Sequence, residues 1–316
     1  MSKTAFIFPG QGSQTVGMMK ELFDNYAVVR ETFKVADEAL GFSISKLCFE
    51  GPEDQLRLTF NTQPAILTAS VAATAVLKEH GITAQIAAGH SLGEYSALVL
   101  AGAIEFADAV RVVRKRGQFM QEAVPVGEGS MAAILGMKSS EDIIAICKEV
   151  EAKSGKAVQA VNFNCPGQVV IAGSTEGVNL AIEALKAGGA KRAVLLPVSA
   201  PFHSSLMQPA SERLATEFNN ISFKKAQIPV VSNVTAEITS DAAQIQELLI
   251  KQAASPVQWE RSIQYMIASG VDCFIEVGPG KVLSGFNKKI NKDITSLNIE
   301  DMVSLDKTLA YFKEVG

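Results

Sequence analysis

The sequence predicts an α/β protein with a mostly parallel sheet and one inserted subdomain. Short apolar runs alternate with helical patterns in both the first and the last part of the chain, as strands and crossover helices do in parallel sheets. A middle segment instead shows two strand patterns in direct succession. Because the chain has 316 residues, of which 47% are hydrophobic and 20% charged, it can bury a large core.

The first part of the chain combines two short apolar runs with three helical patterns. The apolar runs span residues 4–8 and 86–88 and have the length of buried strands. The first helical pattern is rich in alanine and ends at His80-Gly81, a pair typical of a helix C-terminus. Helices are therefore expected over residues 64–77, from the second strand to about 101, and over 106–123.

The middle segment has the pattern of a separate unit. Its elements are expected in the order strand 130–135, helix 140–153, strand 157–163, strand 168–172, helix 175–187 and strand 192–197. This β-α-β-β-α-β order is that of the ferredoxin-like split unit. We therefore predict a ferredoxin-like inserted subdomain over residues 127–198 and a discontinuous catalytic domain formed by residues 1–126 and 199–316.

The last part of the chain returns to the alternating pattern of the main domain. Buried strands are expected over residues 228–232 and 271–277, with helices near 241–252 and 259–268 between them. Strands separated by helices pair in parallel, so these strands extend the sheet begun by the first part of the chain.

Residues 89–93 read Gly-His-Ser-Leu-Gly and follow a predicted strand directly before a predicted helix. A serine on such a G-x-S-x-G turn has a strained backbone and an exposed hydroxyl. The helix N-terminus behind it offers N–H groups to a developing oxyanion. Gly89 and Gly93 lack side chains where strand and helix cross closely. We predict Ser91 as a nucleophile; the alternative is a turn that only packs the strand on the helix.

A serine nucleophile needs a base, and the chain has three histidines. His80 is expected to cap a helix, and the side chain of His90 should point away from the hydroxyl of its neighbour Ser91. His203 lies in a loop where the chain re-enters the main domain, so it is predicted as the base; a surface-loop histidine is the alternative. No Asp or Glu between Ser91 and His203 stands out as a third member, which favours a dyad oriented by a backbone carbonyl.

Arg116 is the second informative residue. On the helix expected over 106–123, Ala109, Val113 and Met120 define an inward stripe, and Arg116 falls in the middle of it. An unpaired buried charge costs at least several kcal/mol, so the guanidinium needs a partner. That partner is either an internal Asp or Glu or the carboxylate of a substrate, gripped by two parallel hydrogen bonds.

The loop Gly10-Gln11-Gly12 follows the first strand and raises the question of nucleotide binding. It lacks the third glycine of the dinucleotide fingerprint, and no Gly-Lys-Ser/Thr follows, so phosphate binding is discounted. The backbone N–H of Gln11 is instead suited to an oxyanion hole, whose second donor would be the N–H of Leu92 after the nucleophile.

Composition narrows the class of protein further. The net charge is −4 with no basic run, so no nucleic acid partner is expected. The N-terminal apolar run is too short for a signal peptide, and no apolar stretch approaches about 18 residues, so no membrane span is expected. The four cysteines show no C-x-x-C spacing and are expected to be reduced thiols of a cytoplasmic protein, neither metal ligands nor disulfides.

Several ordered motifs together resemble one family over nearly the whole chain. The matching blocks are FPGQGSQ (8–14), TQPA (62–65), GHSLG (89–93), RG (116–117), NFN (162–164), PGQ (166–168), His203, PVQW (256–259) and EVGPG (276–280). This series resembles the malonyl-CoA:acyl carrier protein transacylases of bacterial fatty acid synthesis. The resemblance implies an α/β-hydrolase-like core with a ferredoxin-like insertion.

The same resemblance implies roles for individual residues. Ser91 matches the nucleophile, His203 the base and Arg116 the arginine that pairs with the malonyl carboxylate. Gln252 matches the position whose backbone carbonyl orients the histidine, which would explain the missing acid.

Further positions match the family around the reacting group. The N–H groups of Gln11 and Leu92 match the oxyanion hole, and Gln63 and Asn162 lie in matching blocks and are expected to support the site. Leu92 and Phe202 resemble a malonyl-selective pattern in which the aromatic side chain crowds a methyl branch.

The resemblance implies ping-pong transfer of a malonyl group from malonyl-CoA to the phosphopantetheine thiol of acyl carrier protein, without metal or redox cofactor. We expect a monomer and a transient, acidic carrier that docks on a local basic patch. Candidates for that patch are Lys191, Arg192, Lys281, Lys288 and Lys289.

Two other functions remain open from the sequence. A serine esterase or thioesterase would use the same nucleophile, but it predicts rapid attack of water on the acyl-enzyme and gives no reason for Arg116. A non-catalytic module that binds carrier protein would leave Ser91 inert to acyl thioesters.

Overall fold

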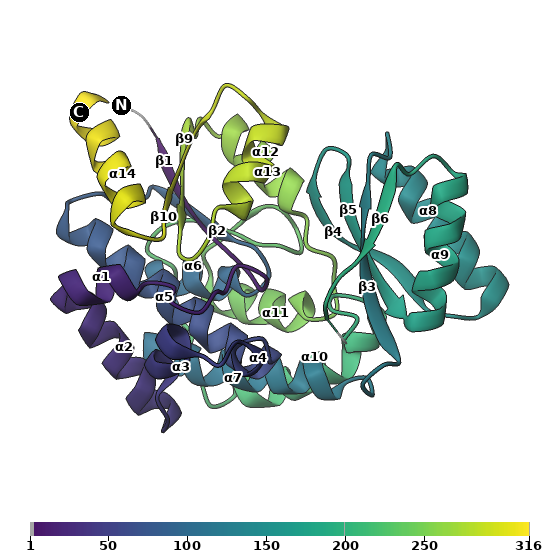
Figure 1. Cartoon of the computed structure of the whole chain (residues 1–316), viewed down its shortest axis with the longest axis horizontal. Coiled ribbons are helices and arrows are strands. Elements are labelled where there is room, and N and C mark those ends of the chain that lie inside the picture. The colour runs from purple at the N-terminus through teal and green to yellow at the C-terminus, as the bar shows by residue number, and fades with distance from the viewer. Residues whose placement is uncertain (1–2, 199, 316) are drawn as a thin grey trace.

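The computed structural model describes residues 3–198 and 200–315, which form two sheets with their helices (Figure 1). The larger sheet has the strand order β10-β9-β1-β2-β7-β8, and all neighbours in it are parallel except β7 and β8. This confirms the predicted mostly parallel sheet. Its strands are β1 (Thr4–Phe8), β2 (Ile86–Gly89), β7 (Val230–Val231), β8 (Ile238–Thr239), β9 (Cys273–Val277) and β10 (Thr295–Ile299).

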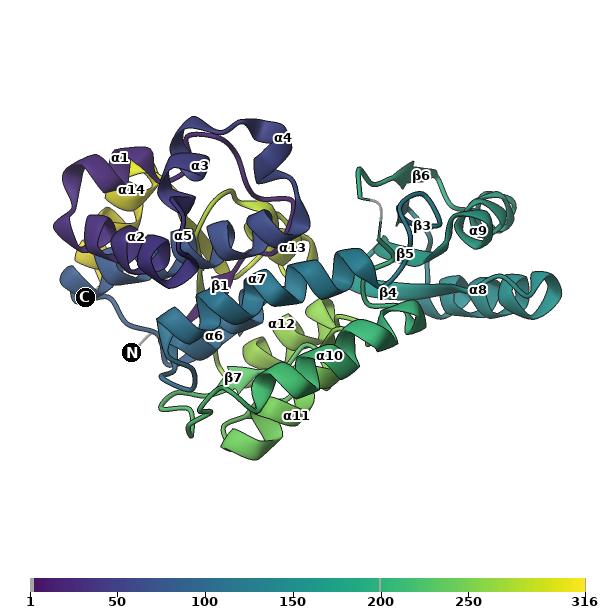
Figure 2. The same ribbon diagram turned by 90° about the horizontal axis from the view of Figure 1, so that it is seen from below.

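The central strands of this sheet are buried on both faces. In β1, Phe6 and Phe8 join one hydrophobic cluster and Ala5 and Ile7 join another, because successive side chains of a strand point to opposite faces. Helices cover both faces, and a strand between two such layers is a continuous apolar run, as the sequence TAFIF is. Figure 2 shows these helices around β1.

The helices of this part are α1 (Lys20–Asn25), α2 (Ala27–Leu40), α3 (Ile44–Glu50), α4 (Glu53–Leu56), α5 (Thr59–Glu79), α6 (Gly93–Leu100), α7 (Phe106–Glu122), α10 (Gln208–Phe218), α11 (Ala242–Gln252), α12 (Trp259–Ala268), α13 (Val282–Ile290) and α14 (Met302–Val315). A 3₁₀ turn, Ser205–Met207, precedes α10. Over residues 3–198 and 200–315, the helices lack the combined length and apolar character that crossing a membrane requires.

The second sheet is antiparallel and lies beside the first (Figure 1). Its strand order is β4-β5-β3-β6, and the chain order of its elements is the predicted β-α-β-β-α-β. The elements are β3 (Gly129–Leu135), α8 (Ser140–Ser154), β4 (Val158–Cys165), β5 (Gln168–Ser174), α9 (Thr175–Ala187) and β6 (Arg192–Leu195). The predicted domain boundary before residue 199 falls on a position outside the described residues.

The two faces of the second sheet have different neighbours. One face packs on α8 and α9, which lie on the side away from the larger sheet in Figure 2. The other face contributes Met131 and Val170 to a cluster with Met120 of α7 and Phe202. Strand β4 is also tied to the loop before α12, because the N–H of Phe163 donates to the carbonyl of Val257 at 3.0 Å. The cavities between the two sheets have one wall from each sheet and its loops.

Several predicted boundaries were wrong. Helix α5 begins at Thr59, five residues before Pro64, although proline favours the first turn of a helix. The N–H groups of Asn61 and Thr62 already donate to the carbonyl of Leu58 at 2.7 and 2.8 Å, so the helix is under way before the chain reaches Pro64. Strand β7 has two residues where five were predicted. Helices α1 to α4, α10, α13 and α14 and strands β8 and β10 were not predicted.

Candidate active site

Ser91 lies on the turn between β2 and α6, at the carboxyl end of a central parallel strand. Its φ of 50° is in the left-handed region, which costs a residue with a side chain about 1–2 kcal/mol. The close crossing of strand and helix was predicted correctly: a Cβ on Gly89 would lie 1.9 Å from the carbonyl carbon of Gly93, and a Cβ on Gly93 would lie 2.1 Å from the carbonyl oxygen of Phe8. The turn thus holds the serine hydroxyl above the sheet edge.

Asn233, in the turn after the neighbouring strand β7, fixes the serine turn. Its side-chain oxygen accepts from the N–H of Ser91 at 2.7 Å, and its side-chain NH₂ donates to the carbonyl of Gly89 at 2.7 Å. Sequence reasoning missed this residue. The available signal was its place directly after the strand predicted over 228–232, since parallel neighbours end at the same sheet edge.

His203 approaches Ser91 from the loop that leaves the second sheet. Its Nε2 lies 2.7 Å from the Ser91 Oγ, and its Nδ1–H donates to the backbone carbonyl of Gln252 at 2.9 Å. Since a carbonyl only accepts, Nδ1 carries the proton and Nε2 is free to accept one. Burial, and then the charge of Arg116, lowers the pKa of His203 to about 3, so the imidazole is neutral near pH 7.

The other two histidines lie where the sequence suggested. The side chain of His90 points away from the Ser91 hydroxyl: its Nε2 lies 2.9 Å from the Asn164 Oδ1, and its ring packs 5.6 Å from that of Trp259. His80 ends α5, and its Nε2 contacts the hydroxyl of Tyr26 at 3.1 Å. Neither ring is hydrogen-bonded to Ser91.

Arg116 is 1% exposed and reaches the serine from α7. Its Nη1 donates to the Gln63 Oε1 at 2.8 Å, and its Nη2 donates to the Gln252 Oε1 at 2.9 Å and to the Ser91 Oγ at 3.1 Å. Among the residues that the structure describes, its Nε has no hydrogen-bond acceptor, and no carboxylate lies within 4.0 Å of the guanidinium. The internal ion pair considered from the sequence is therefore not found, and the guanidinium keeps donor capacity for an anion.

Glu94 lies beneath these groups and was not predicted. Its side chain is 1% exposed and accepts from the Gln252 Nε2 at 2.7 Å and from the N–H of Asn233 at 3.1 Å. Burial raises the pKa of Glu94 to about 7 against the opposing effect of these hydrogen bonds. No sequence pattern separated it from an ordinary acidic residue in the first turn of a helix.

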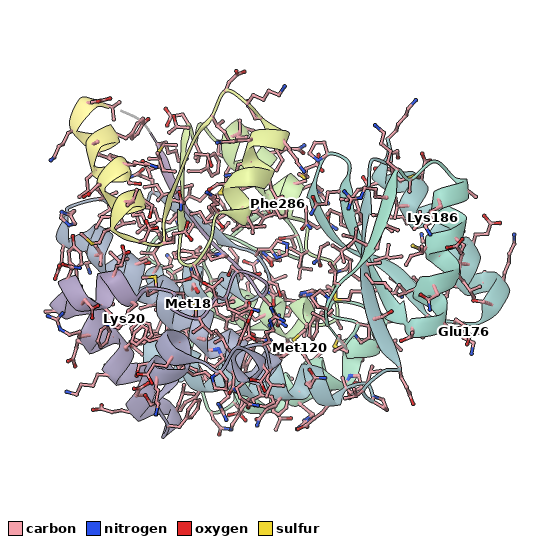
Figure 3. The ribbon with its side chains drawn as sticks, in the orientation of Figure 1. Met18, Lys20, Met120, Glu176, Lys186 and Phe286 are labelled. Carbon is pink, nitrogen blue, oxygen red and sulfur yellow. The ribbon has the colours of Figure 1, made fainter. Side chains whose placement is uncertain are left out.

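A cavity of about 90 Å³ is lined by Ser91, His203 and Arg116. Its lining includes Gln11, Gln63, Ser91, Leu92, Arg116, Met120, Met131, Asn162, Phe202 and His203, which covers every predicted site residue except Gln252. Met120, labelled in Figure 3, lies between the two parts of the molecule. Within the described part of the chain, the backbone N–H groups of Gln11 and Leu92 donate no hydrogen bond, so both are free to bind an oxyanion.

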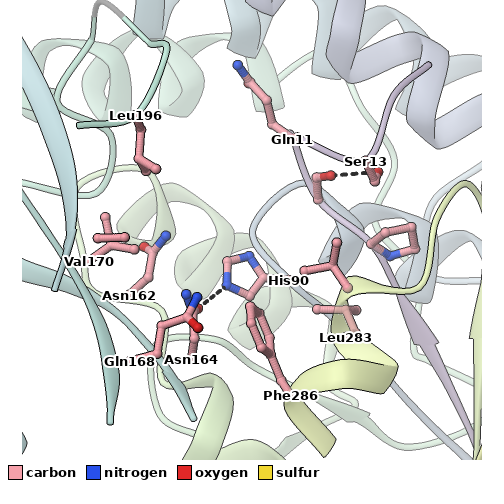
Figure 4. Close-up of a pocket in the computed structure, with 15 residues that line it drawn as sticks. Gln11, Ser13, His90, Asn162, Asn164, Gln168, Val170, Leu196, Leu283 and Phe286 are labelled. Atoms are coloured by element: carbon pink, nitrogen blue, oxygen red, sulfur yellow. Dashed lines mark hydrogen bonds between the residues drawn. The ribbon is translucent and has the colours of Figure 1, made fainter. Parts of the chain in front are cut away.

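A second cavity of about 200 Å³ adjoins the first (Figure 4). Both cavities share Gln11, His90, Asn162 and Leu196 in their linings. Figure 4 shows amide side chains on the second-sheet wall and Leu283 and Phe286 on the other. The buried Oδ1 of Asn162 has no hydrogen-bond partner among the residues described, so this space offers amides and apolar surface to an extended ligand.

Comparisons with known proteins identify the family. The acyl transferase domain family matches residues 5–305. The malonyl CoA-acyl carrier protein transacylase of Bacillus subtilis (strain 168) is 52% identical over 314 residues, which cover 99% of this chain and 98% of that protein.

Solved structures of malonyl-transacylases superpose closely on this chain. The malonyl CoA-acyl carrier protein transacylase of Clostridium perfringens superposes with a TM-score of 0.96 at 48% identity, covering 99% of this chain and 98% of that one. A malonyl-transacylase in complex with a type II PKS acyl-carrier protein superposes with a TM-score of 0.95 at 46% identity, covering 98% and 100%. The serine turn, the buried arginine and these full-length similarities lead to one conclusion: the chain belongs to the acyl transferase family, among the malonyl CoA-acyl carrier protein transacylases.

Proposed function

We propose that this protein transfers a malonyl group from malonyl-CoA to the phosphopantetheine thiol of acyl carrier protein and so supplies the extender unit for fatty acid synthesis. One observation carries the proposal. The Ser91 Oγ lies 2.7 Å from a neutral imidazole nitrogen of His203 and 3.1 Å from the Nη2 of the buried Arg116. A nucleophile beside a cation without a carboxylate partner suits an acyl group that carries its own carboxylate.

The first half-reaction loads the serine. The His203 Nε2 takes the hydroxyl proton as the Ser91 Oγ attacks the thioester carbonyl of malonyl-CoA. The oxyanion is bound by the N–H groups of Gln11 and Leu92, and removal of one such donor costs about 3–4 kcal/mol in protease data. The carbon–sulfur bond then breaks, and CoA leaves with the proton held by His203.

The second half-reaction reverses these steps with another thiol. His203 accepts the proton of the carrier's phosphopantetheine thiol, whose sulfur attacks the malonyl-serine ester. The bond between the acyl carbon and the Ser91 Oγ breaks, and the serine regains its proton from His203. This ping-pong sequence uses only groups of the protein, so we propose no metal or redox cofactor.

Selectivity for malonyl follows from the walls of the inner cavity. Arg116 would bind the malonyl carboxylate, held toward the serine by the amide oxygens of Gln63 and Gln252. Phe202 lines the same cavity and is 8% exposed, which supports its proposed role in crowding a methyl branch. Asn162 lines both cavities and would bind the substrate where the thioester continues into the outer one.

The carrier would dock at the outer cavity. Helix α13 supplies Leu283 and Phe286 to its lining and ends in the exposed Lys288 and Lys289. These lysines, together with the exposed Lys191, Arg192 and Lys281, are the basic patch that we propose for an acidic carrier. We propose that the protein acts as a monomer, with its partners malonyl-CoA and the carrier both bound transiently.

The finer description of the fold is also proposed. The parallel sheet with a serine turn after β2 supports an α/β-hydrolase-like core over residues 1–126 and 199–316. The strand order β4-β5-β3-β6 supports a ferredoxin-like subdomain over 127–198. All four cysteines are buried thiols, which supports a cytoplasmic location.

The intact mass of the protein after brief mixing with malonyl-CoA tests the proposal. We expect a gain of one malonyl group that is absent in Ser91→Ala and is discharged by holo carrier protein. Release of CoA without a lasting adduct would indicate a hydrolase instead. An unmodified protein with no CoA released would indicate a binding module.

A further inference from the structure

Glu94 is a buried carboxylate to which the mechanism above gives no part. It lies in the first turn of α6, and its Oε2 accepts from the side-chain NH₂ of Gln252 at 2.7 Å and from the N–H of Asn233 at 3.1 Å. Both partners are donors, and they favour the charged form of Glu94 against the burial that raises its pKa to about 7.

The side chain of Gln252 joins this carboxylate to the reactive groups. Its Nε2 donates both to Glu94 and, at 2.9 Å, to the backbone carbonyl of Ser91. Its Oε1 accepts from the Arg116 Nη2 at 2.9 Å, and its backbone carbonyl accepts from the Nδ1 of His203 at 2.9 Å. One residue thus contacts the nucleophile, the base and the guanidinium.

An amide such as that of Gln252 can present either end to a neighbour. In the observed orientation the NH₂ meets two acceptors and the oxygen meets a donor. In the reversed orientation the NH₂ would face the guanidinium of Arg116, and the oxygen would face the carboxylate of Glu94. The carboxylate of Glu94 therefore acts together with the backbone carbonyl of Ser91 to favour the orientation in which the amide oxygen meets Arg116.

We propose that Glu94 is a positioning residue, which fixes the amide of Gln252 so that its oxygen holds Arg116 ready for the malonyl carboxylate. This inference rests on the proposed function. Glu94 touches neither substrate nor reacting atoms in this role; it acts through Gln252. Its second contact, to the N–H of Asn233, supports the residue whose side chain holds the Ser91 turn.

The test compares malonyl-CoA and acetyl-CoA as donors in acyl-enzyme formation. Glu94→Gln removes the charged acceptor and leaves the carbonyl of Ser91 as the only acceptor that must be met by the NH₂ of Gln252, so the amide is held less firmly. The malonyl-to-acetyl ratio of kcat/KM is therefore expected to fall about 10-fold, mainly through a higher KM for malonyl-CoA. Glu94→Asp keeps the charge one methylene further away and should give an intermediate ratio. If Glu94→Gln does not fold, the ratio in Glu94→Asp carries the test.

A double variant separates positioning from stability. Because Glu94 acts on malonyl selectivity through Arg116, adding Glu94→Gln to Arg116→Ala should leave the malonyl-to-acetyl ratio at the value of Arg116→Ala alone. Glu276→Gln makes the same change at another buried carboxylate, which accepts from the N–H groups of Leu283 and Ser284, and should affect both donors by the same factor.

The outcomes are distinguishable. Equal loss on both donors in Glu94→Gln, or a ratio that falls further in the double variant, would overturn the positioning role. A wild-type protein that forms no malonyl-enzyme would overturn the proposed function, whatever the variants do.

Discussion

Arg116 illustrates how much the position of a single side chain in a sequence can reveal. Its place on an otherwise apolar stripe predicted burial, and the guanidinium is 1% exposed. The nature of its partners was open from the sequence, because helical periodicity says which way a side chain points but not what it meets. The structure surrounds it with two amide oxygens and a serine hydroxyl, all uncharged.

Arg116→Ala is therefore expected to separate malonyl from acetyl donors. Loss of a charge-assisted bond to the substrate carboxylate should slow malonyl-enzyme formation about 100-fold, whereas acetyl has no carboxylate to lose and should slow much less. Initial rates of CoA release with both donors measure the difference.

Arg114→Ala is the matched control on the same helix. Arg114 stacks on the ring of Phe42 at 4.3 Å and donates to the Asn61 Oδ1, away from the cavity. It should leave the malonyl-to-acetyl ratio unchanged. Equal slowing of both donors in Arg116→Ala would refute the role proposed for Arg116.

At the scale of elements, the β2–turn–α6 unit was the most predictable part of the molecule. The features that predict this unit lie close together in the sequence. They are a glycine at each end of a five-residue turn, an apolar strand before the turn and a helix after it. Gly93 is required because α6 crosses the end of β1 with no room for a side chain.

Gly93→Ala should accordingly destabilise the fold by about 3 kcal/mol or more, since the added Cβ would meet the backbone carbonyl of Phe8 and not a flexible side chain. Thermal unfolding followed by circular dichroism measures this.

Gly285→Ala provides the comparison within helix α13, where an added Cβ meets nothing within 4 Å. It is expected to stabilise by about 0.5–1 kcal/mol, because alanine loses less backbone entropy than glycine in a helix. A Gly93→Ala protein that unfolds together with the wild type would show that α6 does not approach β1 this closely in solution.

At the scale of the whole molecule, the candidate active site lies where two sheets meet, and this arrangement carries a cost in stability. It buries Glu94 without an ion pair among the described residues, and burial raises its pKa from 4.5 to about 7. Above pH 4.5 the unfolded chain loses this proton more readily than the folded one. The contribution of Glu94 to the free energy of unfolding thus falls as pH rises from 4.5 to about 7, by about 3 kcal/mol in total.

Glu94→Gln removes this titration. The free energy of unfolding of the variant minus that of the wild type should rise by up to about 3 kcal/mol from pH 5 to pH 8. Any pH-independent effect of the substitution is the same at both pH values and does not change this rise. Urea unfolding of both proteins at the two pH values gives the comparison. Burial also raises the pKa of Glu276 to about 7, so Glu276→Gln should show the same sign. A difference that is equal at both pH values would mean that Glu94 is not buried as a charged group.

The sequence by itself determined the alternation of strands and helices, the order of the inserted unit, the serine turn and the inward direction of Arg116. Each of these features is encoded in short segments, no longer than a strand or a few turns of helix. Within such a segment, hydrophobic periodicity and the placement of glycine predict the local structure. The limits of β7 were less predictable, because only two of its residues pair with β2.

The sequence offered His203, Arg116 and Gln252 as site residues, but only the tertiary structure decided which of their atoms meet at Ser91 and added Asn233. The partners Arg116, His203, Asn233 and Gln252 come from three helices or loops and one strand end, as far as 161 residues away in the chain. The hydrogen bonds of Asn233 and Gln252 use side chains that are ordinary in their own segments. Packing the sheets together buries polar groups, and buried polar groups are nearly always hydrogen-bonded. The local sequence does not predict which distant residue will form each of these hydrogen bonds.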